Sequence, residues 1–226
     1  MKKNYWIIIF LLLLAADITG IQLPNEMLEK ISKPLLMPVL AVYFLLQTKN
    51  IKSNFKSWIL AALFFSWAGD VLLMFQADDS NFFLFGLSAF LLAHVFYIIL
   101  FYQVKAKEGI KIDFKFLLIV VTYYAALIFL LFNHLGTMQI PVIVYGLVIS
   151  SMFMLAMHML FIKNKAAGKA MMIGALLFIL SDSLLAINKF YQPFELAGVI
   201  VILTYGLAQL LIIKGTSRYI KSVIPN

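Results

Sequence analysis

Residues 82–103 read FFLFGLSAFLLAHVFYIILFYQ, a run of 22 residues without a formal charge. A helix needs roughly 20 mostly apolar residues to cross the hydrocarbon core of a bilayer, which is about 30 Å thick. This run therefore predicts a membrane-spanning helix. The fold of the whole chain then depends on how many such runs the sequence contains.

Seven other segments have the same character. The eight expected helices lie near 4–22, 33–48, 57–75, 82–103, 114–132, 141–162, 169–188 and 194–214. The linkers between them are too short to hold a further domain. We expect an all-α integral membrane protein, a bundle of about eight transmembrane helices that forms a single polytopic domain over residues 1–226. Any chemistry must then take place inside the bundle or at its mouth.

The composition agrees with this prediction. Of the 226 residues 64% are hydrophobic and 12% are charged, against about 45–50% and about 25% in ordinary soluble domains. The mean hydropathy is +1.00, and there is no Cys. These values exclude a soluble enzyme, a disulfide scaffold, a zinc ribbon and thiol catalysis.

The net charge of +8 reports topology, because long apolar runs separate the basic residues. Of the 18 Lys and Arg, 15 fall at alternate helix ends. By the positive-inside rule this end is cytoplasmic. We expect a multi-pass protein of the cell membrane with both termini in the cytoplasm and no nucleic-acid partner. The 15 residues are Lys2, Lys3, Lys49, Lys52, Lys56, Lys105, Lys107, Lys111, Lys115, Lys163, Lys165, Lys169, Lys214, Arg218 and Lys221.

Prolines help to place the helix starts, because a helix tolerates Pro in its first turn, where the missing N–H costs no hydrogen bond. Pro34 and Pro141 are expected at such positions, with Ser32 as the N-cap of the second helix.

Three expected helices carry a carboxylate, at Asp17, Asp70 and Asp182. A charged side chain near the middle of a bilayer costs on the order of 2.5–3.5 kcal/mol on insertion scales, so such residues usually face the bundle interior and have a function. All three helices run outward from the cytoplasm, which places the carboxylates at one depth in the outer half of the membrane. Lys33 and Asn188 lie at the same level. Asp17 could equally be an interfacial residue that satisfies a Lys.

Asp70 and Asp182 occur in the same small-Asp-x-Leu-Leu pattern, as Gly69-Asp70-Val71-Leu72-Leu73 and Ser181-Asp182-Ser183-Leu184-Leu185. The shift of 112 residues suggests a parallel repeat of four helices plus four, which would bring the two Asp near the repeat axis. Two carboxyl groups close together in a medium of low dielectric cannot both ionise readily. One is then an acid and the other a base, which is the equipment of a hydrolase that needs no metal.

Other polar residues are weaker candidates for a functional site. His94 and Tyr97 share one helix face, and Tyr205 and Gln209 share another. Hydrogen bonds between helices explain these residues as well as contacts with a substrate do. The three His show no metal-ligand spacing, so we expect no metal site and no cofactor.

Taken in order, these fragments resemble the YhhN-like membrane proteins, whose animal members are the transmembrane-86 lysoplasmalogenases. The resemblance covers nearly the whole chain. It rests on the following motifs: Lys33-Pro34; Ser66-x-x-Gly69-Asp70-x-x-Leu73; Gly86 through His94-x-x-Tyr97; Gly174-Ala175-x-x-Phe178-x-x-Ser181-Asp182-Ser183; and Tyr205-x-x-x-Gln209.

The resemblance implies a hydrolase that cleaves the vinyl-ether bond of a lysoplasmalogen, releasing a fatty aldehyde and a glycerophosphoethanolamine or glycerophosphocholine. We assign Asp70 and Asp182 as the acid/base pair, without deciding which begins protonated. Lys33 would hold the lipid phosphate, or would instead anchor the helix or pair with Asp17 or Glu29. The candidates for positioning water or headgroup are His94, Tyr97, Ser181, Asn188, Tyr205 and Gln209, with Asp17 and Ser66 in support.

Two other functions remain open from the sequence. A small proton-coupled transporter or lipid flippase would use the same Asp pair to relay protons. A structural scaffold would leave the two Asp unexplained. The sequence does not fix the oligomeric state.

Overall fold

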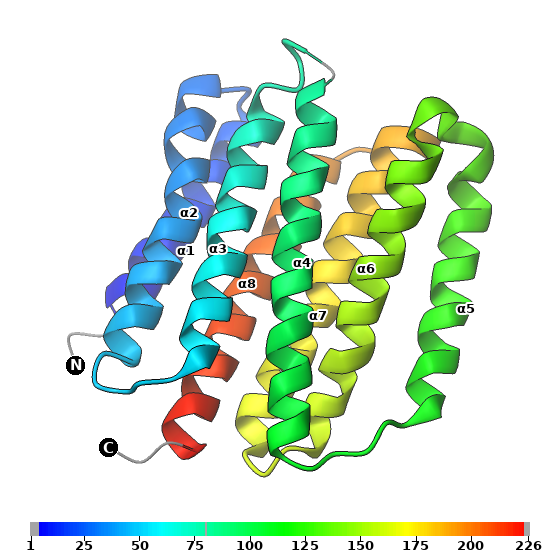
Figure 1. Ribbon diagram of the computed structural model, residues 1–226. Helices are drawn as coiled ribbons and strands as arrows, with labels where there is room; N and C mark the ends of the chain where they lie inside the picture. The colour runs from blue at the N-terminus through cyan, green and yellow to red at the C-terminus, as the bar shows by residue number, and fades with distance from the viewer. Residues whose placement is uncertain (1–4, 80, 224–226) are drawn as a thin grey trace.

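The computed structural model describes residues 5–79 and 81–223 and consists of helices in these ranges (Figure 1). The prediction of an all-α fold is confirmed. The long helices are α1 (Tyr5–Gln22), α2 (Glu26–Gln47), α3 (Asn54–Met74), α4 (Asn81–Lys107), α5 (Phe114–Leu131), α6 (Gln139–Met157), α7 (Lys165–Ala186) and α8 (Ala197–Val223).

Successive helices run in opposite directions, up and down the bundle (Figure 1). The most extensive packing joins α7 with α8 and α3 with α4, while α5 lies at one side and packs mainly on α6. Because all helices are roughly parallel to one axis, residues one turn from the ends of α3 and α7 share the same level.

Seven of the long helices in the described ranges are long and apolar enough to cross a membrane. The segment predicted near 33–48, which is α2, is not among the seven. Its first two turns carry Glu26, Glu29, Lys30 and Lys33. It nevertheless lies alongside α1 and α3 as a full-length member of the bundle (Figure 1). The chain is therefore a multi-pass membrane protein with seven strongly apolar helices and one more polar one.

The start of α2 corrects the sequence prediction. The helix begins at Glu26, and the side chain of Asn25 accepts a hydrogen bond from the Leu28 amide at 3.1 Å. Pro34 lies inside the helix, and Ser32 is no N-cap, since its hydroxyl donates to the Leu28 carbonyl at 2.7 Å. Pro34 donates no backbone hydrogen bond, so the helix continues through this position with one backbone bond fewer.

Other helix ends differ from expectation by a turn or more. Short 3₁₀ turns follow α5, precede α6 and follow α6, at Phe132–His134, Gly136–Met138 and His158–Phe161. A π-helical turn, Ile187–Tyr191, extends α7. The last helix continues to Val223 rather than ending near 214, so Lys214, Arg218 and Lys221 belong to its final turns.

The basic residues gather at one end of the bundle. Of the fifteen, Lys2 and Lys3 lie outside the described residues. The others lie in the α2–α3, α4–α5 and α6–α7 connections or the adjoining turns, and in the last turns of α8, all at the lower end in Figure 1. Helix α1 begins and helix α8 ends toward this end as well (Figure 1). We call it the basic end.

The packing is compatible with a four-plus-four repeat. Under a shift of four helices, the pair α3–α4 corresponds to α7–α8, and the pair α4–α6 corresponds to α8–α2. All four pairs are in contact. Tyr97 and Gln209, which the 112-residue shift relates, meet through a hydrogen bond of 2.5 Å. The contact between α1 and α8 does not fit the repeat. The corresponding helix α5 would have to pack on α4, but it packs mainly on α6 and also contacts the π-helical turn. The repeat stays a prediction.

Candidate active site

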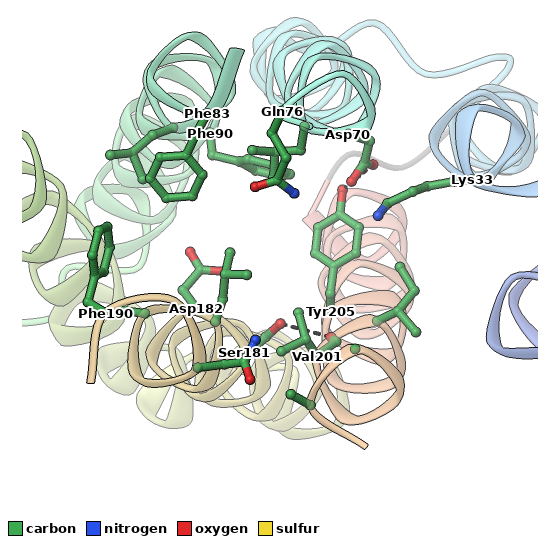
Figure 2. A pocket seen from close by; sticks show the side chains of 18 of the residues that line it. Lys33, Asp70, Gln76, Phe83, Phe90, Ser181, Asp182, Phe190, Val201 and Tyr205 are labelled. Atoms are coloured by element: carbon green, nitrogen blue, oxygen red, sulfur yellow. Dashed lines mark hydrogen bonds between the residues drawn. The ribbon is translucent and has the colours of Figure 1, made fainter. Parts of the chain in front are cut away.

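A cavity of about 360 Å³ lies in the half of the bundle away from the basic end, among α1, α2, α3, α4, α6, α7 and α8 (Figure 2). This volume is within the range of small-molecule binding sites. The cavity wall includes both predicted catalytic residues and four of the predicted binding residues. These are Asp70 and Asp182, and Lys33, Ser181, Asn188 and Tyr205.

Asp70 comes from the last turns of α3 and is 2% exposed. The Tyr205 hydroxyl of α8 donates a hydrogen bond to Asp70 Oδ2 at 2.7 Å. The Lys33 side chain extends from α2 toward this pair (Figure 2). Within the described ranges no carboxylate lies within ion-pair distance of Lys33, so its ammonium is a cation next to Asp70 without direct contact.

Asp182 comes from the last turns of α7, and its side chain is 15% exposed. The Tyr145 hydroxyl of α6 donates a hydrogen bond to Asp182 Oδ2. His94 of α4 is fully buried, with Nε2 at 3.8 Å from the same carboxylate oxygen. Each Asp is therefore held by a tyrosine from another helix.

The two carboxyl groups face the cavity from different walls (Figure 2). No hydrogen bond joins them in the part of the chain that the structure describes. Their shared depth was predicted from the sequence. Direct contact between them is not observed, so the two groups would act on a bound molecule from separate positions.

Tyr97, Gln209 and Ser66 lie one turn deeper than the cavity and do not line it. The Tyr97 hydroxyl donates to Gln209 Oε1 at 2.5 Å, and Gln209 Nε2 donates to Ser66 Oγ at 2.9 Å. All three residues are fully buried. This polar layer joins α3, α4 and α8 and forms the floor beneath the cavity. Helix packing therefore accounts for Tyr97 and Gln209.

Three other candidates have partners within the protein. Ser181 Oγ donates to the Val201 carbonyl at 2.9 Å (Figure 2), and Asn188 Oδ1 accepts from the Phe194 amide at 3.2 Å. Asp17 is fully buried between α1 and α2, where it accepts a hydrogen bond from Ser32 at 3.0 Å. It does not line the cavity.

Tyr145 and Gln76 are not among the site residues expected from the sequence, and Glu29 is expected there only as a partner for Lys33. All three line the cavity. Tyr145 is a lone hydroxyl in the apolar first half of α6, and nothing in its surrounding sequence distinguishes it from a residue that packs at the bilayer interface. The rest of the wall is mainly apolar and includes Leu73, Phe83, Leu87, Phe90, Val142, Leu185 and Phe190.

The sequence model of the YhhN family matches residues 28–216, which include every cavity residue from Glu29 to Tyr205. The chain belongs to the YhhN family. Among curated proteins, this YhhN chain is 30% identical to the human protein named lysoplasmalogenase TMEM86B over 190 residues, which cover 84% of the chain and 75% of that protein.

Two further relatives carry the same name. The pig protein is 31% identical over 182 residues, covering 80% of this YhhN chain and 73% of its own length. The mouse protein is 32% identical over 163 residues, covering 72% and 65%. No solved structure matches the chain.

The cavity of this YhhN chain thus combines three chemical features. The carboxyl groups of Asp70 and Asp182 face it from separate walls and that of Glu29 also lines it, the Lys33 ammonium lies beside Asp70, and aromatic and aliphatic side chains form much of the remaining surface (Figure 2). Within residues 5–79 and 81–223 no three His, Asp or Glu side chains cluster as metal ligands.

Proposed function

We propose that this protein is a membrane-embedded hydrolase that cleaves the vinyl-ether bond of a lysoplasmalogen, giving a fatty aldehyde and a glycerophosphoethanolamine or glycerophosphocholine. The observation that carries the proposal is the pair of carboxyl groups, Asp70 and Asp182, on one cavity with a largely apolar wall. The names of the relatives support the same reaction.

The chemistry of a vinyl ether requires an acid and a base. Protonation of the β-carbon gives an oxocarbenium ion, water adds to this ion as it loses a proton, and the resulting hemiacetal collapses to aldehyde and alcohol. Asp70 and Asp182 supply the proton and accept the one that water loses. A fixed carboxylate nearby also stabilises the positive charge of the oxocarbenium ion.

Tyr205 and Tyr145 determine how the two carboxyl groups are presented. Each hydroxyl bonds to one oxygen of its Asp, which fixes the carboxyl plane and leaves the second oxygen for water or substrate. Lys33 binds the lipid phosphate as a point charge. The apolar residues of α4 and α7 contact the single hydrocarbon chain, which extends from the cavity into the bilayer.

We also propose that the protein lies in the cell membrane with both termini in the cytoplasm. The basic end would then face the cytoplasm. The cavity, in the opposite half of the bundle, would take its substrate from the outer leaflet.

The test is to incubate the purified protein with a 1-alkenyl lysophospholipid and to follow aldehyde release. Asp70→Asn and Asp182→Asn each remove the acid and base function with little change in shape. Each should reduce the rate by at least 100-fold while elution on size-exclusion chromatography stays unchanged. Full activity in either variant would contradict the two-carboxyl mechanism.

The same preparation separates this function from the transporter alternative, which the names of the relatives do not favour. Wild-type protein that is inactive on alkenyl lipids, but moves a solute along a proton gradient in proteoliposomes, would replace the hydrolase proposal.

A further inference from the structure

Two opposite charges on one face of α2 reach the cavity without pairing with each other. Glu29 and Lys33 are four residues apart and both line the cavity. Glu placed four residues before Lys is the favourable order for an ion pair on a helix. The preceding pair on the same helix, Glu26 and Lys30, makes this contact at 2.8 Å at the surface. Glu29 and Lys33 do not come within 4.0 Å of each other.

The structure leaves both groups available. In the described ranges Glu29 has no hydrogen bond or ion pair from its carboxylate, and Lys33 is the only Lys or Arg of the cavity wall. The stem of Glu29 packs tightly on α1, because a Cβ at Gly20 would stand 2.8 Å from Glu29 Cγ. Isolated charges in a partly apolar cavity are costly. A ligand that carries both signs would satisfy the two charges together.

We propose that Glu29 binds the ammonium group of a zwitterionic lipid headgroup while Lys33 binds its phosphate, which makes Glu29 a specificity-determining residue for phosphoethanolamine. This inference rests on the proposed function, since it names the headgroup of that substrate. In phosphoethanolamine an ethylene unit separates the two charges, which suits two side chains one helical turn apart. Asp70 and Asp182 are assigned to proton transfer in the proposed function, so Glu29 is the carboxylate of the described cavity wall that is left for the ammonium.

The same contacts favour a primary ammonium over a quaternary one. A carboxylate accepts charge-assisted hydrogen bonds from N–H groups, and the choline headgroup has none. Quaternary ammonium groups are recognised by cages of aromatic rings. Five aromatic rings line the described cavity wall: Phe83, Phe90, Tyr145, Phe190 and Tyr205. The three Phe lie across from α2, and Tyr205 is the one aromatic ring that Figure 2 labels beside Lys33, so no cage of rings forms around the α2 side of the described cavity.

The experiment compares Glu29→Gln with Glu26→Gln, which removes the same charge from the same helix outside the cavity. The substrates are 1-alkenyl-glycerophosphoethanolamine and 1-alkenyl-glycerol-3-phosphate, which lacks the ammonium. Glu29→Gln should lower kcat/KM for the first substrate by about tenfold or more, in line with loss of a charge-assisted hydrogen bond. It should not lower kcat/KM for the second. Glu26→Gln should leave both values unchanged.

A binding measurement keeps the inference independent of catalysis. The saturated 1-alkyl analogues of the two lipids have no vinyl ether and cannot be hydrolysed by this route. Their Kd values in detergent should show the same tenfold, headgroup-dependent effect of Glu29→Gln. Equal effects on both headgroups, or none, would overturn the role of Glu29. Headgroup-dependent binding by a protein with no activity on alkenyl lipids would support Glu29 and overturn the proposed reaction.

Discussion

At the scale of single residues, the candidate site consists of carboxyl groups that tyrosines from other helices hold in place. Tyr145 reaches Asp182 from α6, and Tyr205 reaches Asp70 from α8. A buried acceptor that loses its donor pays its desolvation without compensation, at a cost of about 1–3 kcal/mol. The tyrosines should therefore matter for activity although neither is assigned a proton to transfer to the substrate.

Tyr145→Phe tests this role on the α7 side. We expect kcat for aldehyde release to fall by about 10–100-fold, because the Asp182 carboxyl loses its orienting hydrogen bond. The matched control is Tyr123→Phe, since Tyr123 also bonds to a side chain of α7, at Ser183, but does not line the cavity. Equal losses in both variants would show that the α7 tyrosine contacts matter only for folding.

The sequence was sufficient to select Asp70 and Asp182 as candidates, because a carboxylate inside the membrane has a high energetic cost. Both line the cavity, and their catalytic role stays a prediction. The tyrosines that bind them were not equally predictable. Tyr205 was predicted to position water or headgroup; it lines the cavity, but its hydrogen bond to Asp70 was not predicted. Placing a Tyr near the bilayer interface costs little free energy. No sequence pattern therefore distinguishes Tyr145 from the other Tyr of the chain. Which hydroxyl reaches which carboxyl depends on helix rotation and packing, which single-sequence periodicity does not determine.

At the scale of helices, the apolar runs of the sequence predicted the number and order of the long helices. They were less accurate for the residues at which each helix begins and ends. The second helix was expected to start near residue 33 and starts at Glu26. Its first turns are charged, so hydropathy does not detect them, although Asn25 is a good N-cap residue. This difference has consequences for the site, because the extra turns are those that carry Glu29.

The α7–α8 interface depends on glycines where the helix backbones approach closely. A Cβ at Gly174 would stand 2.8 Å from the Ala208 carbonyl oxygen and 2.9 Å from the Ile212 nitrogen, which are backbone atoms that cannot move aside. Small residues at such contacts permit close packing in membranes. Both α7 and α8 carry cavity residues, so their spacing also determines the cavity.

Gly174→Ala should therefore lower the melting temperature in detergent by several degrees, in line with an overpacking cost of about 1–3 kcal/mol. Gly198→Ala is the control, because its nearest contact is a side-chain atom, Ile21 Cγ2, at 3.1 Å. Differential scanning fluorimetry of both variants checks this. A larger loss for Gly198→Ala would show that backbone contact at α7–α8 is not the limiting feature.

At the scale of the whole molecule, the two ends of the bundle differ in charge. The basic end contains the α2–α3, α4–α5 and α6–α7 connections, and the cavity lies in the other half of the bundle. The orientation of the molecule therefore decides which leaflet supplies the substrate.

Single cysteines can measure this orientation directly, because the chain has no Cys of its own. Asp78→Cys and Thr137→Cys lie in connections at the end opposite the basic end, and Lys49→Cys and Lys111→Cys lie in connections at the basic end. A membrane-impermeant maleimide added to intact cells should label the first two variants and not the others. The reverse pattern would place the substrate in the cytoplasmic leaflet.

The buried layer of Tyr97, Gln209 and Ser66 has a consequence for the cell. The described cavity ends above this layer, whose side chains satisfy one another by hydrogen bonds. The described cavity is thus closed at this layer and does not continue through it. If Asp70 and Asp182 act as proposed, water would reach them from the cavity side without a continuous path for ions through this layer. A membrane can therefore hold many copies of such a protein and still maintain its voltage.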